Sequence, residues 1–91
     1  MILRWLPRAI TDRDAQLDYI ALDNITAAID QGDRIADHVN KLLDHPKLGR
    51  PGRKKGTREL VINRTPFIAV YQIAGNSIQI LRVLHGAQKW P

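Results

Sequence analysis

The chain has 91 residues, the usual size of one folded unit, and we expect a single domain over residues 1–91. It contains no cysteine, which excludes disulfide bonds and thiolate metal sites, and its 44% hydrophobic and 25% charged residues are typical of a folded protein. No apolar run approaches the roughly 20 residues of a membrane-spanning helix, so we expect a cytoplasmic protein without a membrane partner.

The net charge of +5 is unevenly divided along the chain. Residues 1–46 carry five Lys and Arg against eight Asp, whereas residues 47–91 carry nine Lys and Arg against a single acid, Glu59. A half that basic suits a polyanion or an acidic protein partner, and a solvated basic surface is the plainer alternative.

The N-terminal half predicts one strand followed by two helices. Residues 1–6 are apolar and partly β-favouring, and Pro7 is well placed at the first position of a helix. Apolar residues then recur at helical spacing until the Asp23-Asn24 pair, which offers a cap for a second helix over residues 25–43. We expect the two helices to pack as an antiparallel hairpin, with Gly32 marking their close approach.

The C-terminal half predicts a basic loop and a group of strands. Residues 47–57 are rich in glycine, lysine and arginine and indicate an exposed loop. Strands follow over residues 58–63, 67–74 and 77–85. Gly75-Asn76 is a two-residue hairpin signal, and the tail after residue 85 shows no periodicity. The expected order is β-α-α-β-β-β, an α+β domain with a helical hairpin on one face of a mostly antiparallel sheet.

The sequence resembles the RelE/ParE family of toxins over nearly the whole chain. The most specific segments are Gly49-Arg50, Gly56-Thr57-Arg58-Glu59-Leu60 and Leu81-Arg82-Val83-Leu84-His85-Gly86. The family fold matches the order of elements predicted above. The resemblance implies a toxin of a bacterial type II toxin–antitoxin system, held in a hetero-oligomer by a cognate antitoxin. That antitoxin is expected to be small, with an acidic C-terminal segment that wraps the helices and sheet of the toxin.

Two mechanisms occur in the family. One branch cleaves ribosome-bound mRNA without a metal, so its site needs a base, an acid and cations for the developing charge. The ParE-like branch inhibits DNA gyrase and need not be catalytic. Strand 67–74 lacks the arginine that the ribosome-dependent branch typically places there, and no tyrosine follows Tyr71. We therefore expect gyrase inhibition, with mRNA cleavage as the alternative and a degenerate toxin that only binds antitoxin as a third possibility.

A nuclease of this family would draw its catalytic residues from His85, Arg58 and Arg82. Alternation along the last strand places His85 on one face with Val83, and Arg82 on the other with Ile80. Each residue also has a structural interpretation. His85 would anchor the tail by a hydrogen bond, Arg58 would be an exposed strand-edge arginine, and Arg82 would form a partly buried ion pair.

The residues expected to contact a target are basic or aromatic and come from the loop and the tail: Arg50, Arg53, Lys54, Lys55, Lys89 and Trp90. As phosphate contacts, the loop cations would bind without sequence preference, and a solvated loop is the alternative. Trp90 either packs on the sheet, which we favour, or contacts a partner.

Two further classes fit the sequence less well. A nucleic-acid-binding module would explain the basic half, but both predicted helices are net acidic and no recognition helix stands out. A metal enzyme would need clustered ligands, whereas His38 and His45 are seven residues apart and His85 is remote. We interpret His38 and His45 as surface residues and expect no metal and no other cofactor.

Overall fold

The computed structural model describes residues 1–86 and 88–91. Within these residues the chain forms two α-helices, one 3-10 helix and five strands. In chain order they are β1 (Ile2–Trp5), α1 (Pro7–Asp23), α2 (Ile25–Asn40), the 3-10 helix Lys41–Leu43, β2 (Arg50–Pro51), β3 (Arg58–Val61), β4 (Phe67–Ala74) and β5 (Ser77–His85). None of these helices is long and apolar enough to cross a membrane.

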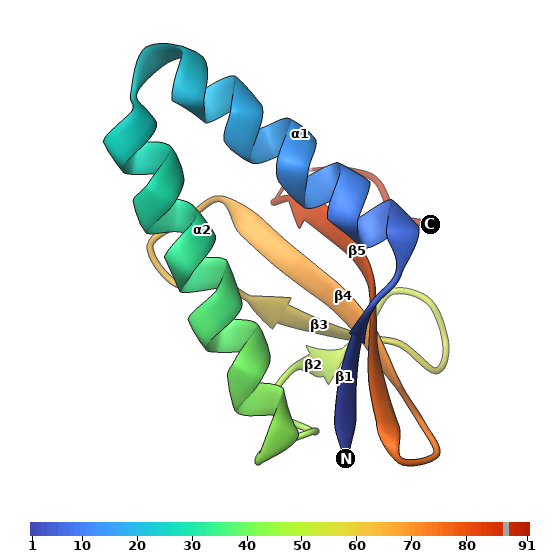
Figure 1. The fold of residues 1–91 in the computed structure, drawn as a ribbon. Coiled ribbons are helices and arrows are strands. Elements are labelled where there is room, and N and C mark those ends of the chain that lie inside the picture. The colour runs from blue at the N-terminus through green and yellow to red at the C-terminus, as the bar shows by residue number, and fades with distance from the viewer. Residues whose placement is uncertain (87) are drawn as a thin grey trace.

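The five strands form one sheet in the order β1-β5-β4-β3-β2. β1 is parallel to β5, and all other neighbours are antiparallel. α1 and α2 pack together as a hairpin and lie over one face of the sheet (Figure 1). The predicted α+β fold, a helical hairpin on a mostly antiparallel sheet, is confirmed.

Local sequence explains how the helical hairpin forms. Pro7 occupies the first turn of α1, where its missing N–H costs no hydrogen bond. The Asn24 side chain accepts a hydrogen bond from the N–H of Ala27 at 3.0 Å and caps α2. Gly32 permits close packing, since a Cβ there would lie 3.3 Å from Cδ1 of Leu17 on α1. The predicted cap and the predicted close approach are both confirmed.

The hydrophobic core lies between the helices and the sheet. Helices and sheet both contribute to its buried cluster: Ala9, Ile35, Val39, Leu42, Leu60, Ile62, Phe67, Ala69, Tyr71, Ile78, Ile80 and Val83. On the opposite face of the sheet, Ile68, Val70 and Leu84 are buried as well. The central strands are therefore covered on both faces, as fully buried strands require.

Three element boundaries differ from the prediction. The α-helix expected over residues 25–43 ends three residues early, because its last turn tightens into a 3-10 helix. The loop expected over residues 47–57 contains the two-residue strand β2, so the sheet has one strand more than predicted. The strand expected over residues 58–63 ends at Val61, because a turn through Arg64 with φ 63° leads into β4.

The alternation of side chains along β5 is interrupted by a bulge. Ile80 and Arg82 pair with adjacent residues of β4, so Leu81 between them has no partner there. Beyond the bulge, His85 faces the helices on the same side as Ile80, and Arg82 faces the opposite side. The prediction that Arg82 shares a face with Ile80 is wrong, whereas the separation of Arg82 from His85 is confirmed.

Candidate functional site

Arg58 and Glu59 are neighbours on β3 and point to opposite faces of the sheet. The Arg58 guanidinium lies on the helix side and donates a hydrogen bond to the carbonyl oxygen of Gly49 at 2.7 Å. Gly49 in turn donates its N–H to the Tyr71 hydroxyl at 2.9 Å. Arg58 is half-buried and holds the chain that enters β2, which differs from the exposed strand-edge arginine expected as its structural interpretation.

The segment around Gly49 is tightly packed on Tyr71. A Cβ at Gly49 would lie 2.7 Å from Cε1 of Tyr71 and 2.9 Å from the carbonyl oxygen of Glu59, so no other residue fits without movement. The Tyr71 hydroxyl also donates to the carbonyl of Pro46 at 2.7 Å. Burial raises the pKa of Tyr71, and the hydrogen bond from Gly49 and the charge of Arg58 offset only part of that rise. Tyr71 is core, as predicted, and it also anchors the chain ahead of β2.

Glu59 organises the basic loop on the other face. The residue is 2% exposed, so its carboxylate needs partners. Arg53 donates to Oε2 from its backbone N–H at 2.9 Å and from Nε at 3.1 Å, and Nη2 of Arg50 lies 3.6 Å from Oε1. Burial alone would raise the pKa of Glu59, but the hydrogen bonds from Arg53 and the charges of Arg53 and Arg50 lower it below its usual value. The carboxylate therefore stays ionised and orients two arginines.

The loop between β2 and β3 is ordered by its own backbone. The Gly52 N–H donates to the Thr57 carbonyl at 2.8 Å, and the Thr57 N–H donates to the Lys54 carbonyl at 3.1 Å. Gly56 adopts φ 84°, which glycine reaches without steric cost. Lys54 and Lys55 are exposed at the tip, and neither forms an ion pair within residues 1–86 and 88–91.

The C-terminal tail lies against this loop. Nη1 of Arg53 donates to the Gln88 carbonyl at 3.0 Å, and the Gln88 N–H donates to the His85 carbonyl at 2.8 Å. Trp90 is half-buried, with its ring centroid 5.5 Å from Cζ of Arg82. Trp90 thus contacts Arg82 of β5, and its role as a partner contact stays a prediction. We call the region that loop and tail form together the basic surface, defined by Arg50, Arg53, Lys54, Lys55, Lys89 and Trp90.

Arg82 forms the partly buried ion pair expected for it. Its Nε lies 2.6 Å and its Nη2 lies 3.3 Å from the two carboxylate oxygens of Asp12 on α1. Asp12 also accepts the Val83 N–H at 3.1 Å, and Gln16 donates to the Val83 carbonyl at 2.8 Å. β1 ends at Trp5 and leaves the edge of β5 beyond Ile80 without a strand beside it. The Asp12 and Gln16 side chains of α1 hydrogen-bond to the backbone of Val83 on this open edge. The sequence did not predict a role for Asp12 and Gln16. The available signal was their spacing of one helical turn, which places both side chains on the same side of α1.

His85 is exposed at the end of β5. Its ring stands edge-on to Phe67 with centroids 6.2 Å apart and lines a pocket of about 340 Å³ with Gln16 and Tyr19 of α1. The anchor expected for the tail is present, but the backbone makes it: the His85 N–H donates to Oε1 of Gln88 at 3.2 Å. The imidazole itself forms no hydrogen bond among the described residues.

The three candidate catalytic residues of a nuclease do not come together. Arg58 is level with Tyr71 on β4, whereas His85 is level with Phe67, four residues or about 13 Å along that strand. Arg82 is on the other face and bound to Asp12. Within residues 1–86 and 88–91, neither Arg58 nor Arg82 is therefore placed to act together with the His85 imidazole.

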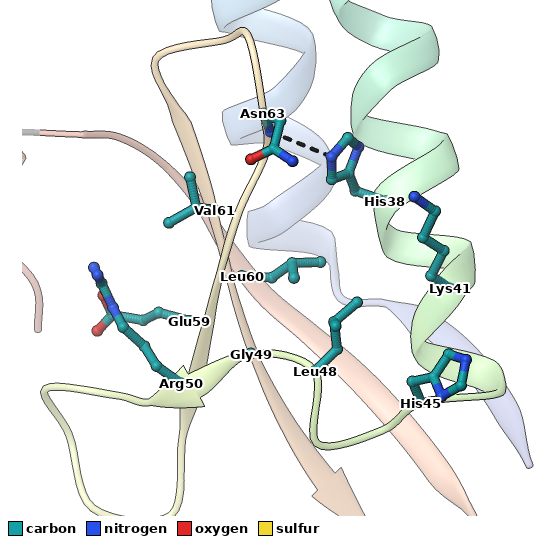
Figure 2. A pocket seen from close by; sticks show the side chains of 10 residues that line it. All are labelled: His38, Lys41, His45, Leu48, Gly49, Arg50, Glu59, Leu60, Val61 and Asn63. Carbon is teal, nitrogen blue, oxygen red and sulfur yellow. Dashed lines mark hydrogen bonds and ion pairs between the residues drawn. The ribbon is translucent and has the colours of Figure 1, made fainter.

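A groove of about 440 Å³ lies between the end of α2 and β3. Figure 2 shows Leu60 directed toward α2 and His38 beside Asn63. The Asn63 N–H donates to Nε2 of His38 at 3.3 Å, so Nδ1 carries the proton and donates to the Arg34 carbonyl at 2.7 Å. His38 is therefore a half-buried residue at the surface that links α2 to the turn after β3. His45 is exposed, as predicted.

Comparison with known proteins gives consistent relatives. Residues 3–90 match the family model of the ParE toxin of the type II toxin–antitoxin system parDE. The protein Y4kP of Sinorhizobium fredii, whose name assigns it as a toxin, is 42% identical over 89 residues, which is 98% of this chain and 92% of that protein. Toxin RelE2 of Caulobacter vibrioides is 31% identical over 84 residues, 92% and 93% of the two chains. A solved chain of the chromosomal ParDE TA system from P. aeruginosa has a TM-score of 0.83 and 34% identity, covering 93% of this chain and 95% of that one.

Proposed function

Because this chain belongs to the ParE toxin family of type II toxin–antitoxin systems, we propose that it inhibits growth by acting on DNA gyrase and that a cognate antitoxin neutralises it. The family model covers residues 3–90, nearly the whole chain. Gyrase inhibition is what the resemblance to the ParE-like branch implies, and it requires a binding surface rather than a set of catalytic groups.

The partners and the exposure of the arginines support this proposal. Arg58 is bound to a backbone carbonyl and Arg82 to a carboxylate inside the protein, so both arginines already have structural partners. The side chains of Arg50 and Arg53 are 62% and 40% exposed even though they cover Glu59. Arg50 and Arg53 thus lie with the exposed Lys54 and Lys55 on the basic surface, an arrangement that suits a macromolecular partner more than bond cleavage.

We also propose that the antitoxin is a small protein whose acidic C-terminal segment covers the basic surface in a toxin–antitoxin hetero-oligomer. The similar solved chain from P. aeruginosa belongs to a structure described as a ParDE TA system. Residues 47–91 contain nine Lys and Arg and one acid, so an acidic segment that folds on binding would meet little electrostatic repulsion there.

A supercoiling assay tests the gyrase proposal. Purified chain should inhibit gyrase in a dose-dependent way, and added antitoxin should relieve the inhibition. The Lys54→Ala/Lys55→Ala variant should need about tenfold more protein for half-inhibition, since two exposed contact charges are lost. Lys41→Ala/Lys47→Ala is the matched control, because it removes the same charge near the end of α2. Equal inhibition by the two variants would contradict a role for the basic surface.

A ribosome-dependent, metal-independent mRNA endoribonuclease is the second candidate. The similarity to Toxin RelE2 favours it, as does His85, whose ring lines a pocket at the end of β5. In a translation assay, mRNA cleavage that His85→Ala abolishes, together with unaffected gyrase, would replace the first proposal. A folded chain that binds antitoxin but shows neither activity would be a degenerate toxin.

A further inference from the structure

A row of three residues crosses the sheet on the face opposite the helices. Glu59 of β3 is level with Val70 of β4, and Val70 is level with Arg82 of β5. Val70 is fully buried although the helices lie on the other face, so other segments must cover this side of the row. The segments that lie here are the loop between β2 and β3 and the C-terminal tail, which contact the row through Arg53 and Trp90.

The C-terminal tail folds back over this face. Gln88 begins the return, because its N–H donates to the His85 carbonyl at 2.8 Å. Nη1 of Arg53 donates to the Gln88 carbonyl at 3.0 Å, and the Trp90 ring centroid lies 5.5 Å from Cζ of Arg82. One contact of the returning tail is thus made by the loop and the other by the sheet.

Arg53 joins this tail to a buried carboxylate. Its backbone N–H and its Nε both donate to Oε2 of Glu59, at 2.9 and 3.1 Å, while Nη1 of the same guanidinium donates to Gln88. Arg50 lies beside Glu59 on the side of β3 away from α2, with Nη2 3.6 Å from Oε1 (Figure 2). A guanidinium is a rigid plane, so the carboxylate that holds Nε also sets the direction of Nη1. The position of the tail therefore depends on Glu59.

We propose that Glu59 is a positioning residue of the basic surface. Through Arg53 it holds the tail against the loop, so that loop and tail meet a partner as one unit. Fixing both segments before binding lowers the cost of ordering them at the contact. Glu59 is itself an anion and would repel an acidic partner, so its place under a basic surface is a positioning role and not an attractive one. The use of this unit against gyrase rests on the function proposed above, whereas the positioning does not.

Two substitutions separate positioning from charge. Glu59→Gln makes the surface more positive by one charge, so charge alone predicts equal or stronger inhibition of gyrase, whereas positioning predicts weaker inhibition. Arg53→Lys keeps the charge but ends in a single nitrogen, in place of the rigid fork that spans Glu59 and Gln88. We expect each variant to need about tenfold more protein for half-inhibition, the effect of losing one hydrogen bond to a charged group.

Amide hydrogen exchange in NMR spectra reports on the tail without gyrase. The Gln88 N–H should exchange about tenfold faster in Glu59→Gln and in Arg53→Lys than in the unchanged chain, because its carbonyl is no longer held. Asp37→Asn and Arg64→Lys are the matched controls, since both residues are exposed and lie outside the basic surface. Both controls should leave the Gln88 exchange rate and the inhibition of gyrase as they are in the unchanged chain.

The outcomes distinguish this proposal from the gyrase proposal. If the unchanged chain does not inhibit gyrase, the function proposed above fails, and the Gln88 exchange rates still decide the positioning. An unchanged exchange rate at Gln88 in both variants would overturn the proposal, and so would stronger inhibition by Glu59→Gln. Faster exchange with unchanged inhibition would overturn it as well, because the fixed tail would then not matter to the target. If Glu59→Gln does not fold, Arg53→Lys decides alone, since it leaves a cation beside the buried carboxylate.

Discussion

Replacing Asp12 tests whether α1 holds the open edge of β5. Asp12→Ala removes both contacts with Arg82 and the acceptor for the Val83 N–H. The Asp12 and Arg82 side chains are 12% and 14% exposed, so water replaces the lost partners poorly. Breaking a buried ion pair from one side costs about 3–5 kcal/mol, and we expect about 3 kcal/mol because some of Arg82 reaches water.

The assay is urea denaturation followed by circular dichroism, which gives the free energy of unfolding for each variant. Asp14→Ala is the control on the same helix. Its side chain is 55% exposed beside Arg13, so its loss should cost less than about 0.5 kcal/mol. Asp12→Asn keeps an acceptor for the Val83 N–H and should fall between the two. If Asp12→Ala and Asp14→Ala unfold at the same urea concentration, the edge contact does not stabilise the fold and the reasoning fails.

Three further predictions concern the site and the helices. Hydrogen bonds and arginine charges lower the pKa of Glu59, so its carboxylate contributes to stability at neutral pH. This contribution is lost as the pH falls below 4.5, the ordinary pKa of a glutamate. In urea titrations, Glu59→Gln should therefore flatten the dependence of stability on pH in this range. Tyr71→Phe leaves the buried Gly49 N–H without its acceptor and should destabilise by about 1–3 kcal/mol, and an unchanged melting curve would refute this. Asn24→Ala should cost about 1 kcal/mol by thermal melting, whereas Asn24→Ser, which keeps a capping oxygen, should not.

Elements with a strong local signal could be predicted from the sequence. The two long strands match their predicted bounds, because residues 67–74 and 77–85 are β-favouring and Gly75 takes the positive φ that the turn between them needs. The first helix begins at its proline. β2 lacked such a signal, since it has two residues, one of them Pro51, and forms only because β3 is beside it.

Contacts between distant segments could not be predicted in the same way. The bulge at Leu81 occurs in a segment without glycine or proline, and it changes which β5 side chains share a face. The Asp12–Arg82 pair joins residues 70 apart. Glu59 was recognised as the single acid of the basic half, but its two arginine partners depend on how the loop folds back. Periodicity describes one element at a time, and these features arise between elements.

The pairing of β1 with β5 has a consequence for biosynthesis. The first strand made is beside the last, and Gln16 contacts Val83, which is translated 67 residues later. During translation the helical hairpin can form from local contacts, whereas the sheet cannot close until β5 has emerged. The basic surface is completed later still, because Gln88 fastens the tail to Arg53. A nascent chain of this fold therefore gains its finished surface only at the end of synthesis.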